Sequence, residues 1–147
     1  MQAAQFVEDA PLLWFDLGSG GGSPAIPLKI VRPQLRLTMV ESKSRKAAFL
    51  GEVVRSLALT AIHVVTVRIE ELARLATVGQ ADLLTVRAVK VQEDLLKTVA
   101  VLLRPGGRIF LFGSESVRLL NHSDFRVIER LSLAAGGSTL QVLSRVA

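Results

Sequence analysis

The sequence predicts a doubly wound α/β domain with a mainly parallel sheet, and three features support this fold class. An apolar run over residues 12–17 precedes glycines at 18, 20 and 22 and then Pro24, which is the order of a strand, a glycine loop and a helix N-terminus. Five strand-like segments alternate with helix-like segments, which predicts parallel strands joined by right-handed crossovers. Two alternating segments around Gly136 and Gly137 predict a hairpin. We therefore expect seven strands, five of them parallel, with the antiparallel strand in the C-terminal hairpin.

The composition fits one globular domain over residues 1–147, in which residues 1–11 form a leader with little pattern. The chain has no cysteine, which excludes disulfides and thiolate metal sites and suits a reducing compartment. We find no apolar run long enough to span a bilayer and no signal-peptide pattern, so we expect no membrane contact and a cytoplasmic location. The net charge of +5 leans mildly toward a polyanionic partner.

The first half of the chain alternates strands and helices. The expected elements are a strand over 12–17, a helix over 25–31, a strand over 35–40, a helix over 43–59, a strand over 62–67 and a helix over 69–76. Short apolar or β-branched runs suit buried strands, and Pro24 suits a first helical turn. Ser42 is the expected cap of the second helix, whose apolar face holds Ala47, Leu50, Val54 and Leu57. In the third helix Leu72 and Leu75 should point inward.

The second half completes the sheet. We expect a strand over 82–86 that ends at Arg87, an amphipathic helix over 92–103, a strand over 108–112 and hairpin strands over 125–133 and 139–146. Glu93 and Asp94 near the start of the helix complement its dipole. Pro105-Gly106-Gly107 should stop that helix.

The glycine loop and two acids indicate the kind of ligand. A dinucleotide fold requires Gly-x-Gly-x-x-Gly, whereas here the third glycine comes one residue early, which fits a cofactor without a pyrophosphate. Asp16, just before the loop, could accept from the cationic amino group of an aminoacyl tail, directly or through water. Glu41 ends the second strand where ribose hydroxyls expect a carboxylate; a solvated strand-end acid is the alternative. S-adenosylmethionine has the ammonium, ribose diol and adenine that match this set.

The pattern Asp16-x-Gly18-x-Gly20-x-Gly22 with Glu41 resembles the class I S-adenosylmethionine-dependent methyltransferases. More narrowly, residues 16–28 are similar to the glycine loop of the RsmG (GidB) family. The stretches 40–50, 68–72, 87–89 and 103–108 fall in that family's order, so the resemblance covers nearly the whole chain from Trp14 onward. It implies a Rossmann-like class I methyltransferase fold.

The resemblance also implies a reaction and a site. Family members methylate N7 of a guanine in 16S ribosomal RNA, so the expected partner is 16S rRNA or the small ribosomal subunit. Gly18 and Ser23 would contact the cofactor, Ile69 and Glu70 would lie beside the adenine, and Arg87 would face the reacting centre as the catalytic residue. The full expected cofactor set is Asp16, Gly18, Gly20, Gly22, Ser23, Glu41, Ile69, Glu70 and Arg87, with no metal.

Guanine N7 carries an in-plane lone pair, so methyl transfer requires no prior deprotonation. Alignment of nucleophile, methyl carbon and sulfur should supply most of the acceleration, and we expect no catalytic base. Arg87 could position a phosphate or the O6/N7 edge of the guanine.

The chain departs from the family pattern at several points. Ser23 replaces a larger apolar residue, Ala25 replaces a glycine, and Phe112-Gly113 replaces a Lys-Gly pair found in many members. The family's helical N-terminal region with an Asn-Leu-Thr motif is absent from the sequence. Two alternatives therefore remain: methylation of another RNA or of a small molecule, and a non-catalytic cofactor- or RNA-binding relative.

Other patterns are weaker. Ser23 with His122 and Asp124 has only a partial serine-hydrolase pattern, because the final glycine is missing and the acid follows the histidine. With His63 and His122 as the only histidines and no cysteine, we expect no metal site. The basic residues that could form an RNA-facing rim are Lys29, Arg32, Lys43, Arg45 and Lys46, with Arg87 and Lys90 as the better RNA candidates near the cofactor edge; a solvated helix face is the alternative for each. Trp14 and Phe15 are expected in the core.

Overall fold

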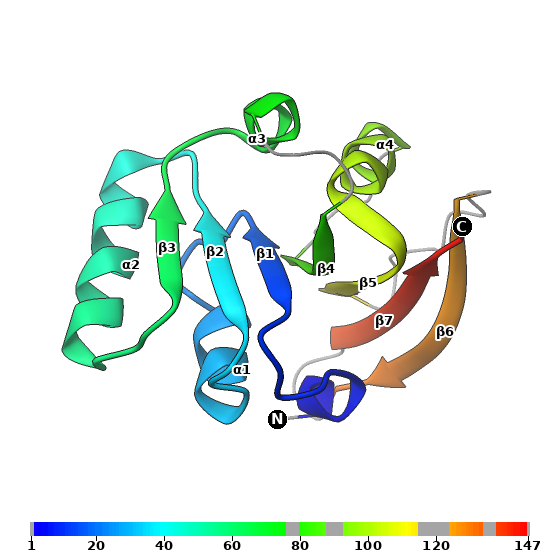
Figure 1. The fold of residues 1–147 in the computed structure, drawn as a ribbon, viewed down its shortest axis with the longest axis horizontal. Coiled ribbons are helices and arrows are strands. Elements are labelled where there is room, and N and C mark those ends of the chain that lie inside the picture. The colour runs from blue at the N-terminus through cyan, green and yellow to red at the C-terminus, as the bar shows by residue number, and fades with distance from the viewer. Residues whose placement is uncertain (1, 76–79, 88–92, 115–123, 134–137, 147) are drawn as a thin grey trace.

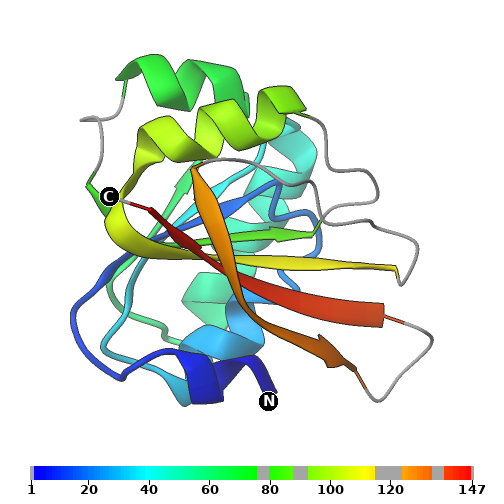
Figure 2. The same cartoon turned by 90° about the vertical axis from the view of Figure 1, so that its right-hand side faces the viewer.

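The computed structural model describes residues 2–75, 80–87, 93–114, 124–133 and 138–146. Its elements are the 3-10 helix η1 (Gln2–Phe6), β1 (Leu13–Leu17), α1 (Ala25–Val31), β2 (Arg36–Val40), α2 (Ser44–Ser56), β3 (Ile62–Val65), α3 (Ile69–Leu75), β4 (Ala81–Arg87), α4 (Glu93–Leu102), β5 (Leu103–Ser114), β6 (Phe125–Ser132) and β7 (Ser138–Arg145). The strands form one twisted sheet, and the helices lie in two layers, one on each face of it (Figure 1). From the side, α3 and α4 lie over one face of the sheet, and α1 and η1 lie over the other (Figure 2).

The seven strands follow the order β3-β2-β1-β4-β5-β7-β6. Strands β1 to β5 are parallel, and β7 runs antiparallel to both β5 and β6, so β6 has the direction of the first five. This confirms the predicted α/β fold and its C-terminal hairpin; Gly136 and Gly137 lie outside the described residues. The chain progresses outward from β1 through β2 to β3 and then returns to β4 on the other side of β1. Ligands of open α/β sheets bind at such a switch point, beyond the carboxyl ends of the strands.

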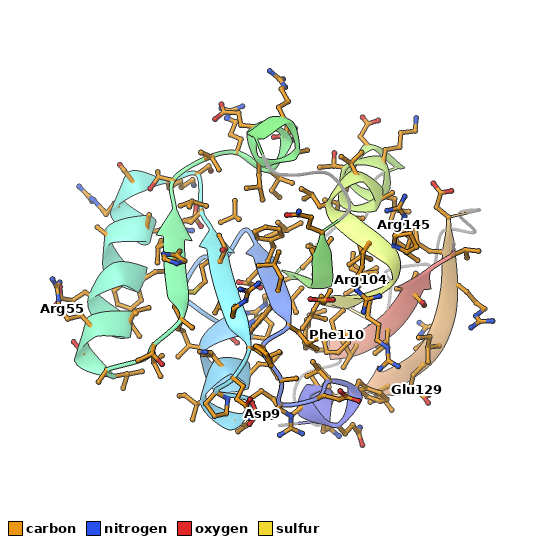
Figure 3. All side chains as sticks on the ribbon, viewed as in Figure 1. Asp9, Arg55, Arg104, Phe110, Glu129 and Arg145 are labelled. Carbon is orange, nitrogen blue, oxygen red and sulfur yellow. The ribbon has the colours of Figure 1, made fainter. Side chains whose placement is uncertain are left out.

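Each face of the sheet has its own core. On one face, α3 and α4 pack their apolar side chains, Leu72 among them, against strand residues such as Leu84; the side chain of Leu75 lies outside the described set. On the other face, α1, α2 and η1 cover Trp14 and Phe110. Figure 3 shows Phe110 in the interior and Arg55 projecting outward from α2. Trp14 is in the core as expected, and Phe15 packs, partly buried, against the core of the opposite face.

The N-terminal segment is part of the second core. Ala3 and Ala4 are buried, and the ring of Phe6 packs edge-on against Phe110 with centroids 6.4 Å apart. The Arg108 guanidinium donates to the Phe6 carbonyl at 2.7 Å. The segment expected as a leader is therefore packed against the sheet. In the described part of the chain, no helix combines the length and apolar character that a membrane crossing requires.

The bounds of α2 differ from those predicted, for reasons visible at both ends. Ser42 does not cap the helix: Lys43 takes the N-cap position, and its N–H donates to the carboxylate of Glu41 at 2.9 Å instead. At the other end the helix stops at Ser56, because Ala58 adopts a left-handed φ of 51°. The N–H groups of Ala58 and Leu59 bond back to Arg55 and Val54, which is a Schellman motif, and Leu57 is left 49% exposed.

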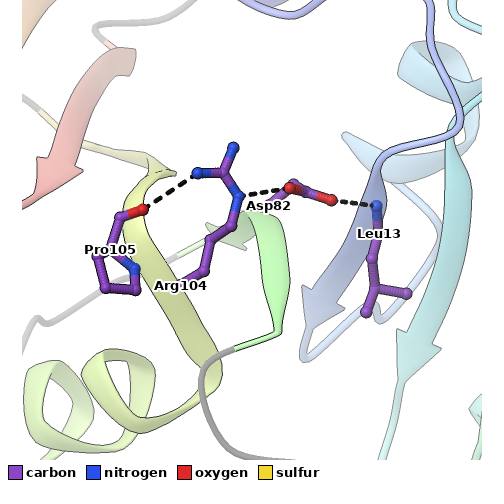
Figure 4. A network of polar contacts seen from close by, with 4 residues as sticks. All are labelled: Leu13, Asp82, Arg104 and Pro105. Carbon is purple, nitrogen blue, oxygen red and sulfur yellow. Dashed lines mark hydrogen bonds and ion pairs between the residues drawn. The ribbon is translucent and has the colours of Figure 1, made fainter.

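The Pro-Gly-Gly segment also differs from its expected role. Helix α4 ends at Leu102, and β5 begins at once with Leu103 opposite Ala81. The next pair, Leu83 with Arg108, follows a shift in register, so residues 105–107 form an irregularity inside β5 rather than the stop between helix and strand. Asp82 connects three strands here, since its carboxylate accepts from the Leu13 N–H at 2.8 Å and from Arg104 Nε at 2.5 Å (Figure 4).

Candidate functional site

Three loops that follow successive parallel strands meet at one pocket of about 300 Å³. Gly18 follows β1, Glu41 follows β2, and Ile69 and Glu70 begin α3 after β3. The carboxyl ends of parallel strands share one edge of the sheet, and this brings the loops together. The pocket is lined by Gly18, Val40, Glu41, Ser42, Val67, Arg68, Ile69 and Glu70. Four residues of the expected cofactor set therefore share one cavity.

Glu41 is fixed on both of its carboxylate oxygens. It is only 6% exposed; Oε1 accepts from the Gly20 N–H at 3.0 Å and Oε2 from the Lys43 N–H at 2.9 Å. Its own N–H donates to the Val65 carbonyl at 3.0 Å, which aligns the end of β2 with β3. Glu41 is therefore not a freely solvated strand-end acid. It joins the glycine loop to the start of α2.

The loop glycines differ in what they permit. Gly18 and Gly20 have φ of +70° and +54°, and a Cβ built on either would meet no described atom closer than 3.9 Å. Gly22 also has a positive φ, but a Cβ there would lie 2.9 Å from a side-chain carbon of Ile26 and 3.3 Å from one of Leu50. The first two glycines thus leave an open face on the loop, whereas Gly22 allows α1 and α2 to pack closely.

Asp16 is enclosed at the end of β1. Its side chain is 2% exposed and is not among those that line the pocket. Oδ1 accepts from Thr85 Oγ1 at 2.5 Å, while Oδ2 is buried and has no hydrogen-bond partner among the described residues. Burial raises the pKa of Asp16 to about 6, although the hydroxyls of Ser19 and Thr85 oppose this rise.

The other two predicted site residues lie beside this arrangement. Ser23 is exposed between the glycine loop and α1. Arg87 is exposed at the carboxyl end of β4, opposite Phe112 of β5. Neither Ser23 nor Arg87 lines the pocket. Lys90 lies outside the described residues.

The predicted basic rim is wrong for two of its members. Lys29 is 2% exposed, and its Nζ donates to the carbonyls of Pro33 at 2.6 Å and Leu35 at 2.5 Å. Arg32 donates from Nε to the Val7 carbonyl at 2.9 Å, and from Nη2 to that of Ala4 at 2.8 Å. Both cations are therefore held by backbone carbonyls. The other three members, Lys43, Arg45 and Lys46, are exposed at the start of α2.

The strand topology excludes the serine-hydrolase pattern of Ser23, His122 and Asp124. Ser23 follows the carboxyl end of β1, whereas Asp124 precedes β6, which runs in the same direction as β1. The two side chains therefore belong to opposite edges of the sheet. His122 lies outside the described residues, and His63 is exposed on β3. In the described part of the chain, no three His, Cys, Asp or Glu side chains gather where they could hold a metal ion.

Sequence reasoning missed Thr85 and Arg68. Thr85 is a lone polar residue in the apolar run of β4, and such a residue in a buried strand requires a polar partner. That signal could have singled it out, but its partner, Asp16, is 69 positions away. Arg68, directly before α3, lines the pocket together with Val40 and Glu41 at the end of β2.

Comparisons with known proteins agree on the family. The model of the GidB family, described as rRNA small subunit methyltransferase G, matches residues 1–127. The ribosomal RNA small subunit methyltransferase G of Chloroflexus aggregans is 44% identical over 103 residues, which cover 69% of this chain and 43% of the relative. The protein of the same name from Corynebacterium diphtheriae is 36% identical over 129 residues, covering 88% of this chain and 56% of the relative. The chain thus spans about half the length of these relatives.

Solved structures of low sequence identity share the fold. The mitomycin 7-O-methyltransferase MmcR is 18% identical and superposes with a TM-score of 0.77, covering 99% of this chain and 52% of that one. The P. horikoshii protein TYW2, solved in complex with MeSAdo, is 14% identical with a TM-score of 0.73, covering 97% and 59%. The fold is the Rossmann-like fold of class I methyltransferases. Given the family match over residues 1–127, the chain belongs to the GidB family of rRNA small subunit methyltransferase G proteins.

Proposed function

We propose that this chain holds the S-adenosylmethionine-dependent centre of an enzyme that methylates guanine N7 in 16S ribosomal RNA. The observation that carries the proposal is the pocket at the switch point of the sheet, where the glycine loop, a fixed carboxylate and the start of α3 converge. Family membership supplies the substrate class. A reaction on small-subunit RNA belongs in the cytoplasm, where ribosomes assemble.

The residues present fit the cofactor. A carboxylate has about four lone-pair sites, and the two N–H donors on Glu41 leave room for ribose hydroxyls. The open face of Gly18 permits close approach of a ligand to the backbone. Asp16 Oδ2 has no hydrogen-bond donor among the described residues, and the ammonium of the cofactor, or a water bound to that ammonium, would supply one. Ile69 and Glu70, which line the pocket, would flank the adenine. Ser23, exposed after the glycine loop, would contact a part of the cofactor that extends beyond the pocket.

When bound, S-adenosylmethionine supplies a methyl group activated by the positive sulfonium. The chain's task is then to hold the guanine with N7 in line, since that nitrogen needs no proton removed. Arg87, exposed at the carboxyl end of β4, would donate to the O6 edge of the base or to a phosphate.

The RNA backbone would lie over the start of α2. Lys43, Arg45 and Lys46 are exposed there, soon after Glu41, and Arg68 is exposed where it lines the pocket. These cations lie beside the proposed cofactor pocket and not at the opposite edge of the sheet. Phosphate contacts of this kind position an RNA without reading its sequence.

The first test is calorimetric titration of the folded chain with S-adenosylmethionine, for which we expect saturable one-to-one binding. Glu41→Ala should weaken binding by about tenfold or more, because it removes the proposed ribose acceptor and frees the Gly20 N–H. Glu52→Ala, an exposed acid of α2 paired with Arg55, is the control and should bind like the wild type. Equal binding by both variants would contradict the role of Glu41, and no binding by a folded wild type would contradict the cofactor.

The second test is methyl transfer to unmodified 16S RNA and to small subunits, with the modified base identified by mass spectrometry. Transfer to guanine N7 would support the proposed substrate. Transfer only to another RNA or a small molecule would replace it, and binding without any transfer would support a non-catalytic relative.

A further inference from the structure

A buried hydrogen-bonded network of three side chains connects the core to Asp16, which lies just before the glycine loop. Trp14 Nε1 donates to Thr85 Oγ1 at 2.8 Å, and Thr85 Oγ1 donates to Asp16 Oδ1 at 2.5 Å. Trp14 and Asp16 are two positions apart on β1 and share a face, and Thr85 is the register partner of Asp16 on β4. Trp14 and Thr85 are fully buried.

The direction of each hydrogen bond in this network follows from which groups can donate and which can accept. An indole N–H only donates, whereas a hydroxyl donates one proton and accepts. Because Trp14 occupies an acceptor site on Thr85, the Thr85 proton remains for Asp16 Oδ1. The hydroxyl of Ser19 donates to the main-chain carbonyl of Asp16 at 3.1 Å and holds the root of the loop.

We propose that Thr85 is a positioning residue for cofactor binding: oriented by the Trp14 indole, it holds the Asp16 carboxyl so that Oδ2 is the oxygen left for the donors of the cofactor's aminoacyl end, directly or through one water. This inference rests on the proposed function. It is supported by the one-sided satisfaction of the carboxyl, in which Oδ1 is bonded and Oδ2 is buried without a partner among the described residues.

The test compares three substitutions on β4. Thr85→Val keeps the shape of the side chain and removes the hydroxyl, whereas Thr85→Ser keeps a hydroxyl. Leu84→Val removes one buried methylene from the core on the opposite face of the same strand and leaves the Asp16 hydrogen bonds in place. Titration with S-adenosylmethionine should show affinity about tenfold weaker for Thr85→Val and within about twofold of wild type for Thr85→Ser. Leu84→Val should bind like the wild type although it is destabilised.

Thr85→Val binding as tightly as the wild type would overturn the inference. So would equal weakening by Thr85→Val and Leu84→Val, since that would mean a general loss of stability. Failure of Thr85→Ser to restore affinity would likewise exclude a role for the hydroxyl.

A second measurement needs no cofactor and separates failure of this inference from failure of the proposed function. Trp14 is the only tryptophan, so its emission reports the hydrogen bonds at its indole. In the free chain, Asp16→Asn should change Trp14 emission and the midpoint of urea unfolding, and in a Thr85→Val background both changes should fall to less than about half. Additive effects would disprove the coupling through Thr85. Coupling in a chain that does not bind S-adenosylmethionine would leave the network intact but overturn both its cofactor role and the proposed function.

Discussion

At the scale of single residues, the burial of Asp16 makes the fold sensitive to pH. Its folded-state pKa is raised from 3.8 to about 6, so the folded protein holds the proton more tightly than the unfolded chain does. The neutral carboxyl is therefore favoured on folding, and the wild type loses stability as the pH rises from about 4 through 6, with no further loss from this group above that. The charged side chains on the adjoining elements, Glu41 after β2 and Lys29 on α1, are bonded to backbone groups rather than to Asp16.

We predict that Asp16→Asn gains stability relative to the wild type as the pH rises. The rise of the pKa from 3.8 to about 6 corresponds to roughly 3 kcal/mol, which should appear as a growing difference between the two proteins from pH 4 to pH 7. Urea unfolding at several pH values measures it, and the other titrating groups cancel in the difference. Parallel stability curves for the two proteins would show that the Asp16 carboxyl titrates normally.

At the scale of elements, helix α2 ends in a Schellman motif in which the residue with left-handed backbone is an alanine, Ala58, rather than a glycine. Ala58 occupies the left-handed position that glycine usually fills, and its Cβ is strained there. Ala58→Gly should therefore stabilise the protein by about 0.5–1 kcal/mol, as seen in thermal or urea unfolding. Ala48→Gly, exposed in the middle of the same helix, should have the opposite effect by about 1 kcal/mol. The same sign for both would refute the strain at Ala58.

The amino edge of the sheet depends on Asp82. Its carboxylate joins β1 to β5 through the Leu13 N–H and the Arg104 guanidinium. Asp82→Ala should lower the free energy of unfolding by about 1–3 kcal/mol, because the Leu13 N–H then loses its partner in a partly buried place. Arg104→Ala leaves that N–H bonded and should have the smaller effect in the same urea titration. A larger loss from Arg104→Ala would assign the stabilisation to the ion pair instead.

Element prediction was accurate where the signal was local. The helix over 25–31 was predicted to the residue, and the strands other than β5 were located within two residues. Burial on both faces leaves continuous apolar runs in central strands such as β1 and β4. The Ser42 cap was wrong, since Glu41 was already bonded to the Lys43 N–H. The Pro-Gly-Gly stop was wrong because pairing of Leu103 with Ala81 draws that segment into β5.

At the scale of the whole molecule, the proposed RNA surface follows from where the exposed cations lie. Replacing Lys43, Arg45 and Lys46 together by alanine should weaken binding to 16S RNA and reduce the slope of log K against log salt by about two to three. The control replaces Arg36 and Arg126, which are exposed at the amino ends of β2 and β6, and should leave the slope near that of the wild type. Equal slopes for the wild type and the triple variant would place the RNA elsewhere.

The sequence by itself determined the fold class, the glycine loop and the acids at the strand ends, because these are patterns of neighbouring residues that fix backbone conformation and burial. Only the tertiary structure decided how the side chains are used. Lys29 and Arg32 donate to backbone carbonyls instead of forming part of the predicted basic rim, and the Asp16 carboxylate accepts from Thr85 on β4. The pairing of Asp16 with Thr85 depends on strand order and register, which bring together positions far apart in the chain and produce no periodic pattern in the sequence.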